Sequence, residues 1–159
     1  MSELDNLKIR NGTPIDHEKI VSVMPEWWDG RDLSSSVLKV FFIHFKDTIY
    51  IAEIRDQLVG FMSQSEEKVG YIHFAGVHPK IRRASIGRLL YEYFYAACNA
   101  SGKSFAKSCT SPFNKLSINF HLRMGFEIEN GDGIVDDLPV TLNFFGNDNH
   151  MVLFKKTIS

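Results

Sequence analysis

The feature that most constrains the fold is the junction at residues 77–94, VHPKIRRASIGRLLYEYF. An apolar, strand-like run ends at Val77 and Pro79, and an apolar segment with helical spacing begins after Gly87. Four cationic side chains crowd this junction: Lys80, Arg82, Arg83 and Arg88. Cations are unfavourable at the positive N-terminal end of a helix unless an anion binds there. The junction therefore predicts a strand, an anion-binding turn and a helix in succession.

The charge of the rest of the chain limits what this anion can be. The 159 residues carry a formal net charge of −1, whereas a general nucleic-acid binder needs a broad basic face. A small anion such as a phosphate group fits a local basic cluster better. Arginine makes charge-assisted hydrogen bonds to phosphate oxygens, and a small residue at the helix start lets a ligand approach the backbone.

The composition favours one globular domain, which we expect over residues 1–159. An apolar fraction of 44%, with thirteen phenylalanines, is enough for a sizeable core. The acidic, polar start and the lack of a long apolar run predict a cytoplasmic protein without a membrane partner. Cys98 and Cys109 have no metal-type or disulfide-framework spacing, and the histidines are too scattered for a metal site.

Hydrophobic period and turn residues predict a mixed sheet with helices on its faces. The expected helices cover residues 13–24, 34–45, 85–100 and 111–126. The expected strands cover residues 7–12, 48–54, 58–65, 70–77, 104–110, 125–130 and 150–158. Pro25 should end the first helix, and residues 55–57 should form a hairpin turn. In the last helix, Ser111 is the expected N-cap, and the expected core stripe is Phe113, Leu116, Phe120 and Met124.

Two motifs resemble those of the GCN5-related N-acetyltransferase (GNAT) superfamily. The run V-x-P-x-x-R-x-x-S-x-G over residues 77–87 is similar to the family's acetyl-CoA signature, Arg/Gln-x-x-Gly-x-Gly/Ala after a strand. Residues 114–126, NKLSINFHLRMGF, resemble the family's downstream helix, Asn-x-x-Ala-x-x-x-Tyr-x-x-x-Gly-Phe. A predicted strand separates the two motifs, as in the family, and the resemblance covers about residues 6–157.

The resemblance implies an α/β (mixed α+β) fold. The single GNAT-like domain would have a central, mostly antiparallel mixed sheet of six to seven strands flanked by about four helices. It would be an N-acetyltransferase that moves the acetyl group of acetyl-CoA to a primary amine by direct attack, assisted by a general base. The amine could belong to a small molecule, an amino acid, a peptide or a protein. Family members often dimerise, which leaves a homodimer open.

The resemblance also implies a set of cofactor-binding residues. The pyrophosphate of CoA would lie on the backbone amides of residues 83–88, and the pantetheine arm would follow residues 75–77. The full expected set is Ala75, Gly76, Val77, Arg82, Arg83, Ala84, Ser85, Ile86, Gly87, Arg88, Asn114 and Ser117. Ser85 replaces the family's usual glycine. A right-handed backbone would suit serine, whereas a ligand that leaves no room for Cβ would bind more weakly.

Two histidines are the candidate catalytic residues. His73 lies on the same strand face as Val77 and could remove a proton from the amine near neutral pH, as a histidine at the matching place does in some family members. His121 occupies the position of the family's tyrosine, which protonates the departing thiolate. For both histidines, packing beside aromatic rings with a hydrogen bond to the backbone is the structural alternative.

The loop EWWDGRD, residues 26–32, is the candidate acceptor site. Trp27 and Trp28 could stack on a ligand while Glu26, Asp29 or Asp32 meets a cation, and Arg31 is assigned to the same site. The tryptophans could equally cap the core. An acidic loop at residues 132–150 could form an opposite wall for an amine or polyamine, or be acidic only for solubility.

Two other functions fit parts of the sequence. Ser85 and His121, as departures from the family pattern, favour a non-catalytic acyl-CoA-binding or sensing domain. A nucleotide-binding enzyme is disfavoured because no complete glycine-rich phosphate motif is present.

Overall fold

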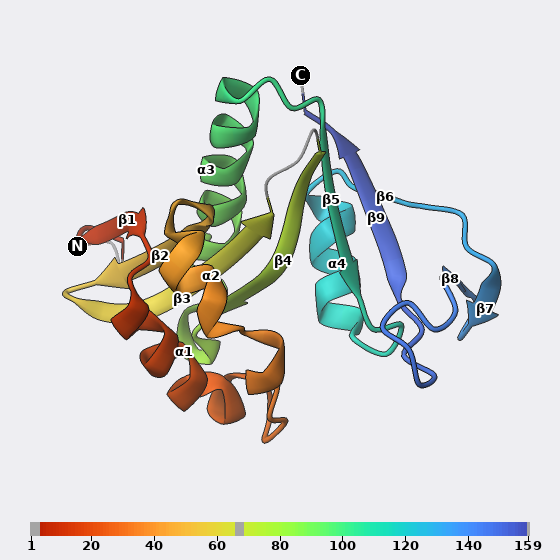
Figure 1. The fold of residues 1–159 in the computed structure, drawn as a ribbon, viewed down its shortest axis with the longest axis horizontal. Coiled ribbons are helices and arrows are strands. Elements are labelled where there is room, and N and C mark those ends of the chain that lie inside the picture. The colour runs from red at the N-terminus through yellow and green to blue at the C-terminus, as the bar shows by residue number, and fades with distance from the viewer. Residues whose placement is uncertain (1–3, 66–68, 159) are drawn as a thin grey trace. The chain divides into compact units, whose positions relative to one another are not determined.

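The computed structural model describes residues 4–65 and 69–158 (Figure 1). Its helices are α1 (Pro14–Trp27), α2 (Lys39–His44), α3 (Ile86–Ala100) and α4 (Lys115–Arg123), with short 3-10 turns η1 (Ser34–Ser36), η2 (Lys46–Thr48) and η3 (Pro79–Ile81). Its strands are β1 (Leu7–Asn11), β2 (Ile49–Ile54), β3 (Gln57–Ser65), β4 (Val69–Val77), β5 (Phe105–Thr110), β6 (Glu127–Ile128), β7 (Gly133–Val135), β8 (Leu138–Val140) and β9 (Val152–Thr157).

Seven of the strands form one sheet in the order β1-β2-β3-β4-β5-β9-β6, and β7 and β8 form a separate two-stranded sheet. The β4–β5 pair is parallel, whereas β1–β2, β2–β3, β5–β9 and β6–β9 are antiparallel. The predicted fold, a mostly antiparallel mixed sheet with about four helices, is confirmed. No helix within the described ranges is long and apolar enough to cross a membrane.

The chain falls into two compact units, Met1–Ser65 with His73–Phe94, and Glu66–Ile72 with Tyr95–Ser159. The division passes through β4 and through α3, so each of these elements contributes residues to both units. The single domain expected over residues 1–159 stays a prediction.

In the first unit, helices cover both faces of β3. A Cβ on Gly60 would touch Ile86 and Leu90 of α3, so this side of the strand faces α3. The next residue, Phe61, points to the opposite face and packs in the core cluster with Trp27 of α1. Period-2 alternation thus directs successive side chains of one strand to two different helices.

The predicted hairpin joins β2 to β3. Arg55 and Asp56 have φ values of 51° and 61°, the left-handed pair that a two-residue type I′ turn requires. The strands pair from Ile54 with Gln57 up to Ile49 with Ser63. Gln57, expected within the turn, is the first residue of β3.

In the second unit, β5 is the central strand. It pairs in parallel with Val69–Ile72 of β4 and antiparallel with β9. Helix α4 buries Ile118 and His121, and the His121 ring stacks on Phe154 of β9 at 4.5 Å between centroids.

The prediction that Pro25 ends the first helix is wrong. Helix α1 continues through Pro25 to Trp27. Ile20, Met24 and Trp27 are spaced four and three residues apart and are all fully buried, so the last turn belongs to the core face. A proline this close to the helix end removes one hydrogen bond, and the packing of Trp27 outweighs that loss.

The single helix predicted for residues 34–45 is also wrong. The chain forms η1, then an interruption at Val37 and Leu38, then α2. The carbonyl of Ser36 is bonded by the ring of His73, and the carbonyl of Val37 by the ring of His17. Side chains from α1 and β4 therefore take up carbonyls that a continuous helix would have used.

Helix α4 begins later than predicted and turns a different face to the core. Asn114, not Ser111, is its N-cap, because the Asn114 side chain accepts a hydrogen bond from the Ser117 N–H at 3.2 Å. Phe113 and Leu116, assigned to the core stripe, are each 73% exposed.

Candidate functional site

The junction between β4 and α3 has the predicted order of strand, turn and helix. After Val77, η3 turns the chain, and the Ala84 N–H bonds the Ile81 carbonyl at 3.1 Å. The Ser85 carbonyl then accepts the first hydrogen bond of the helix, from the Leu89 N–H at 3.0 Å. Among the described residues, the N–H groups of residues 85–88 have no acceptor, so they form the open N-terminus of a fifteen-residue helix.

Ser85 lies in the left-handed region of backbone conformation, with φ = 64°. A right-handed backbone, which would have suited serine, is therefore not what the chain adopts. Glycine reaches positive φ without steric cost, which explains why a glycine is usual at this place in the motif. The turn keeps its shape with serine, at some cost in local strain.

The arginines of the junction have different partners. Arg82 donates from Nη2 to the Trp27 carbonyl and from Nε to the Val77 carbonyl, the latter at 3.2 Å. It thus joins the end of α1 to the end of β4. Arg88 pairs with Glu92 at 3.2 Å on the exposed face of α3. Arg83 is exposed and has no side-chain partner within the described part of the chain, so its guanidinium is the one most available to a phosphate group.

The β4 residues expected to follow the pantetheine arm also have a packing role. A Cβ on Gly76 would collide with the ring of Trp28, so the glycine lets this ring lie directly on the strand. Trp28 also packs against Phe74, at 5.3 Å between centroids. The backbone of Ala75, Gly76 and Val77 therefore lies beside an aromatic layer on one face.

The predicted acceptor loop proves to be the C-terminal cap of α1. Trp27 is 1% exposed and belongs to the core, as the capping alternative expects. Asp29 and Gly30 have positive φ values of 52° and 84°, and the Gly30 N–H closes on the Pro25 carbonyl at 2.6 Å. Asp29 and Arg31 are exposed, and Arg31 Nε donates to the Trp28 carbonyl at 3.3 Å.

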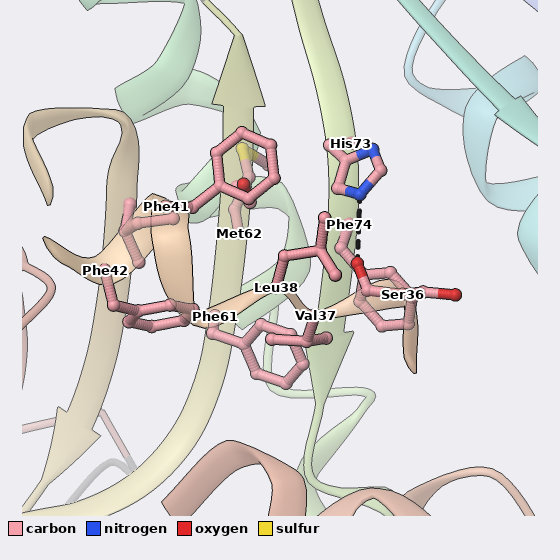
Figure 2. Close-up of a pocket in the computed structure, with 11 residues that line it drawn as sticks. Ser36, Val37, Leu38, Phe41, Phe42, Phe61, Met62, His73 and Phe74 are labelled. Carbon is pink, nitrogen blue, oxygen red and sulfur yellow. Dashed lines mark hydrogen bonds between the residues drawn. The ribbon is translucent and has the colours of Figure 1, made fainter. Parts of the chain in front are cut away.

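His73 is held by the segment between η1 and α2 (Figure 2). Its Nε2 lies 3.0 Å from the Ser36 carbonyl oxygen. A carbonyl oxygen only accepts, so Nε2 of His73 carries a proton and donates it to this oxygen. His17 makes the matching contact, Nε2 to the Val37 carbonyl, at 2.9 Å. Two rings thus hold consecutive carbonyls of one segment, and a base at His73 would act through Nδ1.

A small cavity of about 10 Å³ lies beside His73, between the α2 segment and strands β2, β3 and β4 (Figure 2). Ser63 of β3 also lines it. The Ser63 hydroxyl is buried, and among the described residues it has no hydrogen-bond partner. The sequence did not identify Ser63 as a site residue. In the run LVGFMSQS, a serine is expected on the exposed face of a strand whose polar and apolar residues alternate.

His121 is packed among aromatic rings in the second unit. It is 4% exposed, and its Nδ1 donates to the Ser117 carbonyl at 2.8 Å. Burial lowers the pKa of His121, and the hydrogen bond to Ser117 opposes this only in part. A neutral ring with its proton on Nδ1 can accept but not donate at Nε2. These contacts favour the packing alternative, and the acid role stays a prediction.

Asn114 and Ser117, the other residues expected to contact the cofactor, belong to the first turn of α4. The side-chain oxygen Oδ1 of Asn114 caps the helix. The side-chain NH₂ group of Asn114 therefore still has two N–H donors that it can offer to a cofactor. Next to them, Lys115 forms an ion pair with Asp136 of the β7–β8 turn. Asp136 belongs to the acidic loop at residues 132–150, so one carboxylate of that loop is engaged with a lysine.

The structure thus gathers the predicted residues into two groups. The first unit holds the β4–α3 junction, Trp28 and His73, and the second unit holds Asn114, Ser117 and His121. The residues that pattern analysis missed are Ser63 and the carbonyl of Ser36, both of which meet His73 or its cavity.

Comparisons with known proteins identify the family and the fold. The family model described as Acetyltransferase (GNAT) family matches residues 17–126. No curated protein sequence matches the chain. Similar solved structures include Ard1 from Thermoplasma volcanium, with 16% identity over 97% of this chain and 99% of that chain and a TM-score of 0.77.

Two further structures have the same fold. One is yncA from Salmonella typhimurium, solved with its cofactor acetyl-CoA, with 14% identity over 98% of this chain and 95% of that chain and a TM-score of 0.70. The other is the ribosomal-protein-S18-alanine N-acetyltransferase from Escherichia coli, with 12% identity over 96% and 94% of the two chains and a TM-score of 0.72. At these identities the likeness shows the fold.

Proposed function

Since the chain belongs to the GNAT family of acetyltransferases, we propose that it transfers the acetyl group of acetyl-CoA to a primary amine. The observation that carries this proposal is the turn at Ser85, which leaves the N–H groups at the start of α3 without acceptors in the described chain. Such a helix end attracts phosphate through its N–H groups and its dipole.

The residues at the junction suit the pyrophosphate of acetyl-CoA. The N–H groups of Ile86, Gly87 and Arg88 would donate to phosphate oxygens, and the unpaired guanidinium of Arg83 would add a charge-assisted hydrogen bond. We assign Arg82 to positioning, because its guanidinium already holds two carbonyls at the ends of α1 and β4. Asn114 and Ser117 stay predictions for further cofactor contacts.

His73 is the proposed general base of the transfer. The amine nitrogen attacks the thioester carbonyl carbon, a C–N bond forms and the C–S bond breaks. The proton lost by the amine goes to Nδ1 of His73, directly or through water, and the thiolate that leaves takes up a proton from solvent water, to which His73 later returns its own. The Ser36 carbonyl fixes the ring through Nε2, so the base keeps one orientation, and positioning of the amine supplies much of the rate.

A non-catalytic acyl-CoA-binding domain is the second candidate. The strained serine at position 85 and the buried neutral ring of His121 favour it, because both depart from the catalytic pattern of the family. Release of free thiol in the presence of an amine distinguishes the two functions.

The first test is the melting temperature with acetyl-CoA and with ATP, at one ionic strength. We expect acetyl-CoA at about 100 times its dissociation constant to raise the melting temperature by roughly 5 °C or more, and ATP to have little effect. Arg83→Ala should weaken acetyl-CoA binding about tenfold. Arg82→Ala should lower the melting temperature of the free protein.

Arg123→Ala removes an exposed cation from α4 and serves as the matched control. We expect it to leave both the affinity for acetyl-CoA and the melting temperature of the free protein unchanged. No thermal shift with acetyl-CoA would contradict the proposal. Binding without thiol release, for any amine tested, would support the non-catalytic alternative instead.

A further inference from the structure

The cavity beside His73 has the size of an amino group. Its volume of about 10 Å³ is that of a site for one water-sized group. Its walls are mainly apolar, with the rings of Phe41, Phe42, Phe61 and Phe74. Among the described residues, no Asp, Glu, Lys or Arg lines the cavity, so these walls offer no charge with which to hold a second cationic group of a ligand.

Ser63 gives this cavity one polar anchor. The residue is 7% exposed, and its buried hydroxyl has no hydrogen-bond partner in the described residues. A buried hydroxyl without a partner is unfavourable, and such groups call for a ligand or another functional explanation. A hydroxyl can both accept and donate, so it can accept from the N–H of an amine. His73 lines the same cavity.

The surface around the cavity is largely apolar. Four apolar residues on and beside α2 are between 44% and 50% exposed: Leu38, Val40, Ile43 and Phe45. Leu38 both lines the cavity and belongs to this exposed surface. In α2, Lys39 forms an ion pair with Glu18 at 3.6 Å. In the following turn η2, Lys46 and Asp47 are both exposed. Such a surface attracts an apolar group.

We infer that the acetyl acceptor is a monoamine carried on an apolar group, such as an arylalkylamine or alkylamine, an assignment that rests on the proposed function. Its amino group enters the cavity between Ser63 and His73, and its apolar part lies on Leu38 and the exposed surface of α2. Ser63 is then a substrate-binding residue, and Leu38 determines specificity. It differs from the acidic acceptor site for an amine or polyamine that the sequence suggested, which stays a prediction.

The test compares acetyl-CoA-dependent thiol release with 2-phenylethylamine, hexylamine and spermidine. We expect kcat/KM to be at least tenfold higher for 2-phenylethylamine and hexylamine than for spermidine. Ser63→Ala should lower kcat/KM for 2-phenylethylamine about tenfold, because one hydrogen bond to the amine is lost. Leu38→Glu should shift the preference toward spermidine by tenfold or more. Ile15→Glu places the same charge on an exposed apolar position of α1 that does not line the cavity, and it should leave the preference unchanged.

Equilibrium binding of 2-phenylethylamine to the CoA-loaded protein, measured by calorimetry, separates the two possible failures. One outcome is that the unaltered protein binds 2-phenylethylamine without releasing thiol, and that Leu38→Glu weakens this binding. That outcome would support the proposed amine site and contradict the transfer reaction. Equal or better turnover of spermidine by the unaltered protein would overturn the inference and leave the transferase function intact. Absence of both binding and turnover with the apolar amines would overturn the inference as well.

Discussion

At the scale of single residues, Ser85 shows how one backbone angle makes a site. Its φ of 64° sets the start of α3 and leaves the helix N–H groups open. A serine is tolerated there because the flanking η3 turn and the helix hold the chain on both sides, but the Cβ group remains strained.

Replacement of Ser85 by glycine should relieve this strain. We expect Ser85→Gly to raise the free energy of unfolding by up to about 1 kcal/mol and to leave acetyl-CoA binding equal or tighter. The same exchange at Ser22, an exposed position in the right-handed interior of α1, should instead cost roughly 0.5 kcal/mol. Urea denaturation and acetyl-CoA titration of both variants measure these effects. A Ser85→Gly protein less stable than Ser22→Gly would show that the serine hydroxyl, not the backbone angle, matters at the junction.

At the scale of elements, the first strands and α1 are joined by one arginine. Arg10 of β1 contacts Asp16 of α1 at 2.8 Å and Glu53 of β2 at 2.6 Å. Thr13, the N-cap of α1, also donates to Asp16 from its backbone and its hydroxyl, at 2.8 Å each. Burial alone would raise the pKa of Asp16, but the hydrogen bonds from Arg10 and Thr13 outweigh it and hold this pKa at about 2.

This carboxylate should make stability depend on acid pH. Because the folded pKa is lower than the unfolded one, the contribution is complete above about pH 4 and is lost as the pH falls toward 2. We expect Asp16→Asn to cost about 2 kcal/mol at pH 7. The difference from the unaltered protein should shrink steadily below pH 4.

Asp47→Asn, at an exposed position in η2, is the matched control and should have little effect at either pH. Urea denaturation at pH 7 and pH 3 measures both variants. A stability difference for Asp16→Asn that stays constant between these values would mean that its ionised form is not what holds α1 to the strands.

At the scale of the whole molecule, β4 and α3 determine how the two units behave on unfolding. Each element has residues in both units, so neither unit can lose its structure without disrupting a strand and a helix of the other. We expect a single cooperative thermal transition, with equal calorimetric and van't Hoff enthalpies. Differential scanning calorimetry tests this, and two separable transitions would show two domains in place of the one expected from the composition.

Local patterns in the sequence determined the order of elements and the character of the junction. Apolar alternation marked β2, β3 and β4, and the cations before Ser85 marked the open start of α3. These features depend on residues a few positions apart, which share one face or one turn. The motif at residues 77–87 and the helix at residues 114–126 also identified the family, because their glycine, proline and asparagine positions reflect local backbone requirements.

Only the tertiary structure decided what the individual side chains do. Arg82 meets the carbonyl of Trp27, 55 residues away, and His73 meets Ser36, 37 residues away. The spacing of apolar residues shows that one face of an element is apolar, but not which other element covers it. For this reason the sequence analysis assigned the wrong core face to α4. It also gave no indication of the buried hydroxyl of Ser63. The partners of polar groups are set by packing between distant segments, and the candidate acceptor site exists only once those segments meet.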